Sequence, residues 1–264
     1  MTKQKFSQRK LRQIGNMFDL ELVNAADPED LLGVLLKYRG SEAESSKDKG
    51  QAFLAYVLKN FNFSKAQIFQ DLFALFVANE KKGGYFVEFG ATNGITLSNT
   101  WLLEKSYGWN GILAEPARCW HAELRANRTC KIETNCVWSK SSEQLEFNEA
   151  SSQELSTLDV FSESDGHSLD RKNGNRYLVE TITLNELLEK HSAPREIDYL
   201  SIDTEGSELT ILSNFDFKKY NIRLITVEHN FTDARNKIYD LLSNNGYKRF
   251  FAKFSRFDDW YIKI

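Results

Sequence analysis

From residue 83 onward, the chain alternates short apolar runs with longer segments in which apolar residues recur at helical spacing. Apolar runs of this kind are typical of strands buried on both faces of a parallel sheet. The helical segments between them provide the crossovers that parallel strands need. We therefore expect a doubly wound α/β sheet, mostly parallel, with helices on both faces. The expected strands cover residues 85–91, 111–116, 131–138, 144–150, 176–184, 197–203, 222–231, 247–257 and 259–264, and the expected helices cover 96–108, 117–128, 184–191, 207–215 and 234–246.

The first 82 residues have a different pattern, which is helical throughout. Helices are expected over 28–38, 51–61 and 66–84, and a polar Gly/Ser-bearing loop over 39–50. We therefore divide the chain into an N-terminal helical segment, residues 1–82, and a Rossmann-like domain, residues 83–264, which the helical segment caps.

Composition excludes several classes of function. The chain of 264 residues has a formal charge of -3, so it lacks the basic field that nucleic-acid binding usually needs. Its longest apolar runs are much shorter than the about 20 residues that span a bilayer, so no transmembrane segment is expected. Its three cysteines show no CxxC spacing, which argues against a disulfide framework or a structural zinc site and favours a cytoplasmic location. A homo-oligomer is compatible with this composition.

The stretch YFVEFGATNG places an acid, Glu88, in the first expected strand and follows it with a glycine-punctuated turn containing Gly90, Asn93 and Gly94. In doubly wound sheets ligands bind at the carboxyl ends of the strands, where the first turn supplies backbone amides. Gly90 and Gly94 allow a close approach, but their spacing does not match the pyrophosphate fingerprint. Glu88 suits a cationic ligand, or it is a strand-end acid that accepts hydrogen bonds from loop amides; both interpretations stay open.

Two further strand ends extend this expected site. Glu115 ends the second strand, at about the 20-residue distance from the glycine turn where an acid usually accepts hydrogen bonds from ribose hydroxyls. Asn135 and Cys136 end the third strand, where an adenine ring would lie. Cys136 is alternatively a packed small residue.

Polar residues also end the fourth and fifth strands. Asp203 ends the fourth strand and Glu205 follows in the turn, while Glu228, His229 and Asn230 end the fifth strand. The oxygens of Asp203, Glu228 and Asn230 are the kind of ligand that a hard divalent cation prefers. Asp203, Glu205 and His229 are the candidate catalytic residues, with His229 as general base. The alternative for the acids is capping of backbone amides, and for His229 it is packing.

The segments YFVEFGATNG, ILAEP, IDYLSIDTEGSEL and ITVEHN, in this order, resemble the FkbM family of S-adenosylmethionine-dependent methyltransferases over about residues 80 to 250. The most specific segment is D-x-E-G-x-E, which contains Asp203, Glu205 and Glu208. The resemblance implies a class I methyltransferase sheet closed by a C-terminal antiparallel strand pair. It also implies methylation of a hydroxyl group, on a sugar, a glycan or a natural product. With the turns above, the expected cofactor-binding residues are Glu88, Gly90, Asn93, Gly94, Glu115, Asn135, Cys136 and Asp203.

The acids after the fourth and fifth strands are similar to those of catechol O-methyltransferases, which implies Mg²⁺ or Mn²⁺ as a second cofactor. Three alternatives stay open: metal-free catalysis with His229 as base, a nicotinamide oxidoreductase, and a catalytically silent cofactor-binding module. No [DN]-P-P-[YF] motif follows the fourth strand, which argues against methylation of a nucleobase amino group. The polar stretch over 150–176 is expected to be a mobile lid over the methyl acceptor.

Overall fold

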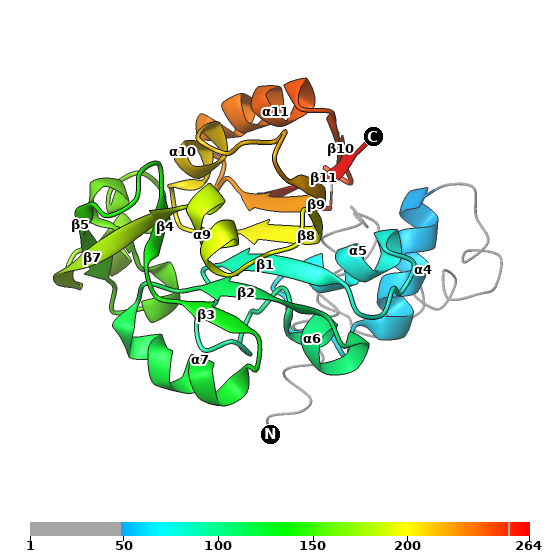
Figure 1. Ribbon diagram of the computed structural model, residues 1–264, viewed down its shortest axis with the longest axis horizontal. Helices are drawn as coiled ribbons and strands as arrows, with labels where there is room; N and C mark the ends of the chain where they lie inside the picture. The colour runs from blue at the N-terminus through cyan, green and yellow to red at the C-terminus, as the bar shows by residue number, and fades with distance from the viewer. Residues whose placement is uncertain (1–48, 253) are drawn as a thin grey trace, which may run out of the picture.

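The computed structural model describes residues 49–252 and 254–264; the helix predicted over 28–38 and most of the loop predicted over 39–50 lie outside them. The main sheet has seven strands in the order β10-β11-β9-β8-β1-β2-β3 (Figure 1). Its five mutually parallel strands are β1 (Tyr85–Phe89), β2 (Asn110–Ala114), β3 (Lys131–Glu133), β8 (Glu196–Ile202) and β9 (Asn221–Glu228). The antiparallel strands at the C-terminus are β10 (Tyr247–Phe250) and β11 (Asp258–Lys263). The predicted class I methyltransferase-like sheet is confirmed.

Helices cover both faces of this sheet because successive strand residues point to opposite sides. Phe86 and Tyr199 pack in one core, and their chain neighbours Val87 and Leu200 pack in the other. The first core is covered by α4 (Lys49–Asn60), α5 (Gln70–Val77), α6 (Trp101–Tyr107) and α7 (His121–Asn127). The second is covered by α9 (Leu184–Lys190), α10 (Glu208–Ser213) and α11 (Ala234–Asn244). None of the helices in the described ranges has the length and apolarity needed to cross a membrane.

The helices before residue 83 share the first core with the sheet. Phe53 of α4 is fully buried; its ring stacks on Phe251 at 5.0 Å between centroids and meets Trp260 of β11 edge-on at 5.8 Å. The helix predicted over 66–84 is shorter than expected, because α5 ends at Val77 and the chain then turns through left-handed backbone at Asn79 and Glu80. The division of the chain at residue 83 stays a prediction.

A second sheet of four strands, in the order β4-β7-β5-β6, lies beside the carboxyl edge of the main sheet (left in Figure 1). Its strands are β4 (Cys136–Trp138), β5 (Gln144–Glu149), β6 (Thr157–Leu158) and β7 (Asn175–Thr183). The single strand predicted over 131–138 is therefore wrong: it divides between the two sheets. The carboxylate of Glu133 accepts hydrogen bonds from the backbone amides of Thr134 and Asn135 and turns the chain there.

The predicted lid, residues 150–176, contains short elements besides β6. They are the 3₁₀ turns η2 (Gln153–Leu155) and η3 (Asp159–Phe161) and the helix α8 (Ser168–Arg171). The strand predicted over 247–257 is also shorter than expected. It ends at Phe250, because Phe251 and Arg256 adopt left-handed backbone and the described residues between them lie in turns or bends.

Candidate active site

A cavity of about 280 Å³ opens at the carboxyl edge of the main sheet. It is lined by the ends of β1, β2, β8 and β9 on one side, and by the second sheet and the segment 153–167 on the other. The sequence-predicted site residues that line it are Gly90, Glu115, Cys136, Asp203, Glu205, Glu228 and Asn230. Those that do not line it are Glu88, Asn93, Gly94, Asn135 and His229.

Gly90 brings the turn after β1 against the turn after β8. Its φ is +73°, and a Cβ atom there would lie 2.0 Å from the carbonyl oxygen of Asp203. The glycine is thus needed for contact between two strand ends of the protein itself. It lines the cavity as a result of that contact.

Glu115 is buried at the end of β2, with its carboxylate held by backbone on both sides. One oxygen accepts from the amide of Thr92 at 2.8 Å, and the other accepts from the amide of Ala117 at 2.8 Å. Burial raises the pKa of Glu115 to about 7. The hydrogen bond from Thr92 therefore joins the glycine turn to the end of β2 at the cavity.

Glu88 occupies the interior beneath the glycine turn. Its carboxylate accepts from the backbone amide of Asn99 at 2.6 Å and from the hydroxyls of Ser98 and Thr100, and Arg128 lies 3.8 Å away. These contacts favour the second of its two sequence interpretations, a strand-end acid that holds a loop. Side chains alternate between the two faces of a strand, so Glu88 points to the same face of β1 as Phe86, toward the first core.

The other predicted residues away from the cavity also serve local structure. The side-chain oxygen of Asn93 accepts from the amides of Ile95 and Thr96. A Cβ atom at Gly94 would meet Arg128 at 2.6 Å, so this glycine permits packing. Asn135 lies in the turn that Glu133 stabilises. Cys136 does line the cavity, and burial raises the pKa of its thiol to about 12, as in a packed cysteine.

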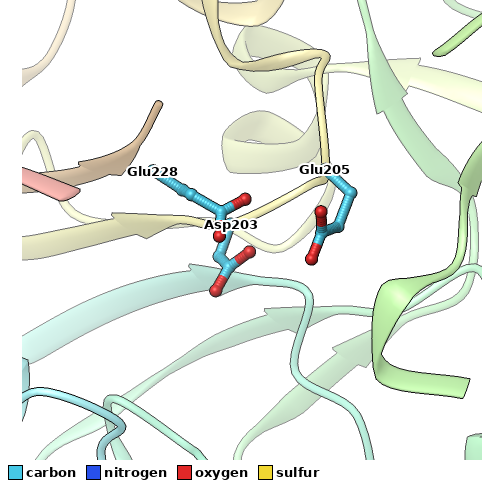
Figure 2. A group of neighbouring side chains, drawn as sticks. All are labelled: Asp203, Glu205 and Glu228. Atoms are coloured by element: carbon cyan, nitrogen blue, oxygen red, sulfur yellow. The ribbon is translucent and has the colours of Figure 1, made fainter. Parts of the chain in front are cut away.

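Three carboxylates converge at the ends of β8 and β9. One oxygen each from Asp203, Glu205 and Glu228 lies within 4.8 Å of the others, and Figure 2 shows the three groups pointing toward one another. Burial, with the charges of Glu208 and Glu88 added to it, raises the pKa of Asp203 to about 7. Burial and the charge of Asp203 raise the pKa of Glu205 to about 9. The pKa of Glu228 is raised well above its ordinary value, first by burial and then by the charges of its neighbours. Such a cluster holds protons or a cation near neutral pH.

Glu205 is held in this cluster by a residue that sequence reasoning missed. Arg171 of α8 is fully buried and lies 2.7 Å from one oxygen of Glu205. The same guanidinium pairs with Asp165 and donates to the carbonyl oxygen of Leu155 at 2.7 Å. Asn230 donates its amide to the same oxygen of Glu205 at 3.3 Å. No spacing rule pointed to Arg171, because it is one of several charged residues in a polar stretch.

His229 faces away from the cavity. Its Nδ1 accepts from the backbone amide of Phe231 at 3.0 Å, and its Nε2 lies 3.8 Å from Asp259 of β11. Burial lowers the pKa of His229 to about 4, so the imidazole is neutral and weakly basic. The structure therefore does not bring the predicted general base to the carboxylates.

Most of the remaining cavity lining was also missed from sequence. It includes apolar side chains from five separate segments, namely Trp120, Phe147, Leu155, Leu158 and Phe257. The predicted lid contributes polar residues, namely Gln153, Glu154, Ser156 and His167. The expectation that 150–176 covers a ligand applied to Leu155, Leu158 and these polar residues. Phe257 belongs to a C-terminal run of aromatic residues that suits either stacking on a sugar face or core packing. No sequence signal pointed to Trp120 or Phe147.

Comparison with known proteins bears on the family. A domain family described as the methyltransferase FkbM domain matches residues 88–249, which include Glu115 and the three converging carboxylates. Among solved structures, the chain is similar to precorrin-6y C5,15-methyltransferase from Geobacter metallireducens GS-15. The two share 10% sequence identity, with a TM-score of 0.40, over 72% of this chain and 80% of that one. No curated protein sequence matches significantly. Since the family match spans more than half of the chain, the protein belongs to the FkbM family of S-adenosylmethionine-dependent methyltransferases.

Proposed function

We propose that this protein transfers a methyl group from S-adenosylmethionine to a hydroxyl group of a sugar, a glycan or a natural-product acceptor. One observation carries the proposal: a single cavity joins the glycine turn and Glu115 to the carboxylates of Asp203, Glu205 and Glu228. The first group of residues suits a cofactor, and the second suits an acceptor with hydroxyl groups.

The residues present fit S-adenosylmethionine. No lysine or arginine is among the described residues that line the cavity, whereas several carboxylates are, which favours a cofactor with a sulfonium and an ammonium group over one with phosphates. We assign Glu115 to the ribose hydroxyls, the turn at Gly90 to the methionine moiety, and Cys136 to the rim of the adenine. When bound, the cofactor supplies an electrophilic methyl group on its sulfonium.

On the acceptor side, the carboxylates accept hydrogen bonds from hydroxyl groups and orient them. In the absence of a bound cation, Asp203 is the proposed base, because a carboxylate with a pKa of about 7 takes up a proton better than an ordinary aspartate does. Glu205 lies beside it in the cavity. The alternative route through His229 has less support, since its imidazole faces Asp259.

The proposal includes the hard divalent cation, Mg²⁺ or Mn²⁺, that was predicted for this edge. Such a cation orients vicinal hydroxyl oxygens and lowers the pKa of one of them. The carboxylate oxygens at the ends of β8 and β9 are the ligand type that these ions prefer.

The test is transfer of a labelled methyl group by the full chain to a panel of neutral sugars, glycans and small alcohols. We expect label in at least one acceptor, and we expect Asp203→Asn to abolish transfer while S-adenosylhomocysteine affinity changes less than about tenfold. Binding of S-adenosylhomocysteine without transfer to any acceptor would favour a catalytically silent module. Thermal stabilisation by NAD, and none by S-adenosylhomocysteine, would contradict the proposal.

A further inference from the structure

We propose that Asp203, Glu205 and Glu228 together bind one hard divalent cation, with Glu205 rather than Asn230 as the third ligand. Arg171 and Asn230 are then positioning residues that hold Glu205 for the ion. The inference deepens the proposed function and rests on it only for the use of the cation in methyl transfer.

Glu228 points to a missing ligand. The residue is 7% exposed and lines the cavity, yet no nitrogen or hydroxyl donor among the described residues reaches its Oε2, and its carboxyl instead contacts the carboxyl of Asp203. A buried carboxylate oxygen without a partner is costly, and protein structures rarely leave one so. A cation between Glu228 and its two neighbours supplies the partner.

The spacing of the three carboxylates fits one ion. Two ligands of the same ion are at most twice the metal–oxygen distance apart, which is about 4–5 Å for distances of roughly 2.0–2.6 Å. The ligand oxygens of Asp203, Glu205 and Glu228 already lie within 4.8 Å of one another (Figure 2). The cluster therefore needs little rearrangement to surround a cation.

The contacts of Glu205 show why it, rather than Asn230, completes the site. Its Oε2 accepts from Arg171 at 2.7 Å and from the amide of Asn230 at 3.3 Å. Both donors act on one oxygen, so the carboxylate is oriented while Oε1 has no protein donor in the structure described. Asn230 uses its amide nitrogen to hold a ligand, a role that commonly supports metal sites.

Charge favours the same conclusion. The cavity lining includes five carboxylates among the described residues, and it includes neither lysine nor arginine. Arg171 reaches Glu205 from behind this lining and is shared with Asp165. A divalent cation at the cluster therefore offsets repulsion that no side chain lining the cavity offsets.

The experiment is a titration of the full chain with Mn²⁺, after EDTA treatment and buffer exchange, in the absence of cofactor and acceptor. Calorimetry or electron paramagnetic resonance should show one site per chain, from which Mg²⁺ displaces Mn²⁺. Glu205→Gln and Glu228→Gln should each weaken binding at least about tenfold. Glu154→Gln is the matched control, because Glu154 lines the cavity but is exposed and outside the cluster. Its affinity should equal that of the unmodified chain.

Comparison of Asn230→Ala with Glu205→Gln tests whether Glu205 or Asn230 is the third ligand of the cation. Asn230→Ala should weaken Mn²⁺ binding less than Glu205→Gln does, since Asn230 acts only through Glu205. Thermal unfolding controls for folding: Mn²⁺ should raise the melting temperature of the unmodified chain, and raise that of Glu228→Gln by less. No binding at millimolar Mn²⁺, or binding that Asn230→Ala removes and Glu205→Gln retains, would overturn the proposal. Since no acceptor is used, neither result bears on methyl transfer itself.

Discussion

Two acids at neighbouring strand ends, Glu88 and Glu115, have opposite surroundings. Glu88 lies within β1 and points into the first core, where loop groups and Arg128 occupy its carboxylate. Glu115 follows the last residue of β2, so its carboxylate reaches the cavity while two backbone amides hold it. Position relative to the strand end thus separates a structural acid from a candidate binding acid.

Glu115→Gln should weaken S-adenosylhomocysteine binding at least about tenfold, because hydrogen bonds from ribose hydroxyls to an ionised acceptor contribute roughly 1.5–3 kcal/mol each. Calorimetry on the full chain measures the change. The control is Glu133→Gln, at the end of the adjacent strand β3, where the carboxylate pairs with Lys190 and does not line the cavity. Equal affinity of the Glu115 variant and the unmodified chain would refute the ribose assignment.

At the scale of elements, the predicted lid packs on the turn after β8 through several contacts. Thr157 donates to the backbone oxygen of Glu205 at 2.8 Å, and Arg171 pairs with the carboxylate of the same residue. Gly206 lies under Phe161, where a Cβ atom would be 2.9 Å from that side chain. The predicted lid, residues 150–176, is therefore held by direct contacts to the turn that contains Glu205, one of the proposed acceptor-binding residues.

Arg171→Met should destabilise the protein by about 3–5 kcal/mol, because it leaves Asp165 and Glu205 as buried acids without their counter-charge. Urea unfolding measures the loss, and limited proteolysis should show new cleavage within 150–176. The control is Arg176→Met in the same region, whose partly exposed ion pair with Asp159 contributes at most about 1 kcal/mol. If both variants lose the same free energy of unfolding and are cleaved alike, Arg171 does not hold the segment 150–176 in place.

The lid prediction itself concerns the unmodified protein. Cleavage within 150–176 should decrease when S-adenosylhomocysteine and an acceptor are added, because residues of this segment line the cavity. Cleavage at the same rate with and without ligands would count against a lid.

The helices α4 and α5 share the first core with the main sheet. A substitution in α4 should therefore lower the free energy of unfolding of the whole fold. Phe53→Ala is expected to cost about 3–5 kcal/mol, since it empties a site enclosed by aromatic rings. Phe63→Ala is the control, because that ring is 61% exposed. A small and equal effect of both changes on urea unfolding would instead support a separable N-terminal segment.

At the scale of the whole molecule, the buried acids make stability depend on pH. The folded state raises the pKa of Glu115 and Asp203 to about 7 and that of Glu205 to about 9. Above the ordinary carboxylate range, the folded state therefore binds more protons than the unfolded state, so stability falls as pH rises through these values. His229, whose pKa is lowered to about 4, has the opposite effect, but only below its ordinary value of 6.5.

Between about pH 6.5 and about pH 9, the melting temperature should therefore fall as pH rises, by roughly 2–4 °C for each kcal/mol lost. Thermal unfolding in EDTA, without cofactor, measures it. The slope should be shallower in Glu228→Gln, which removes one acid from the cluster. A melting temperature that does not fall over this range would show that these carboxyls are ionised at their ordinary pKa.

Sequence alone determined the layer architecture and the family. Short apolar runs and period-3.6 patterns are local properties, so strands and helices can be assigned from neighbouring residues, and the alternation of strands with helices leaves few topologies. Strand ends at Glu115, Asp203 and Glu228 could likewise be predicted to share one edge, because parallel strands end on the same side of a sheet.

Only the tertiary structure decided which side chains meet in the cavity. The direction of Glu88 and His229 depends on packing between elements that are distant in sequence. The pairing of Arg171 with Glu205 joins residues from two such elements, and no local period encodes it. Gly90 is a further example. The sequence predicted a glycine that lets a ligand approach, whereas in the structure the carbonyl oxygen of Asp203 leaves no room for a Cβ atom at this position. A local sequence pattern indicates the helix or strand to which a residue belongs. Contacts between elements that are distant in sequence form only when the chain folds.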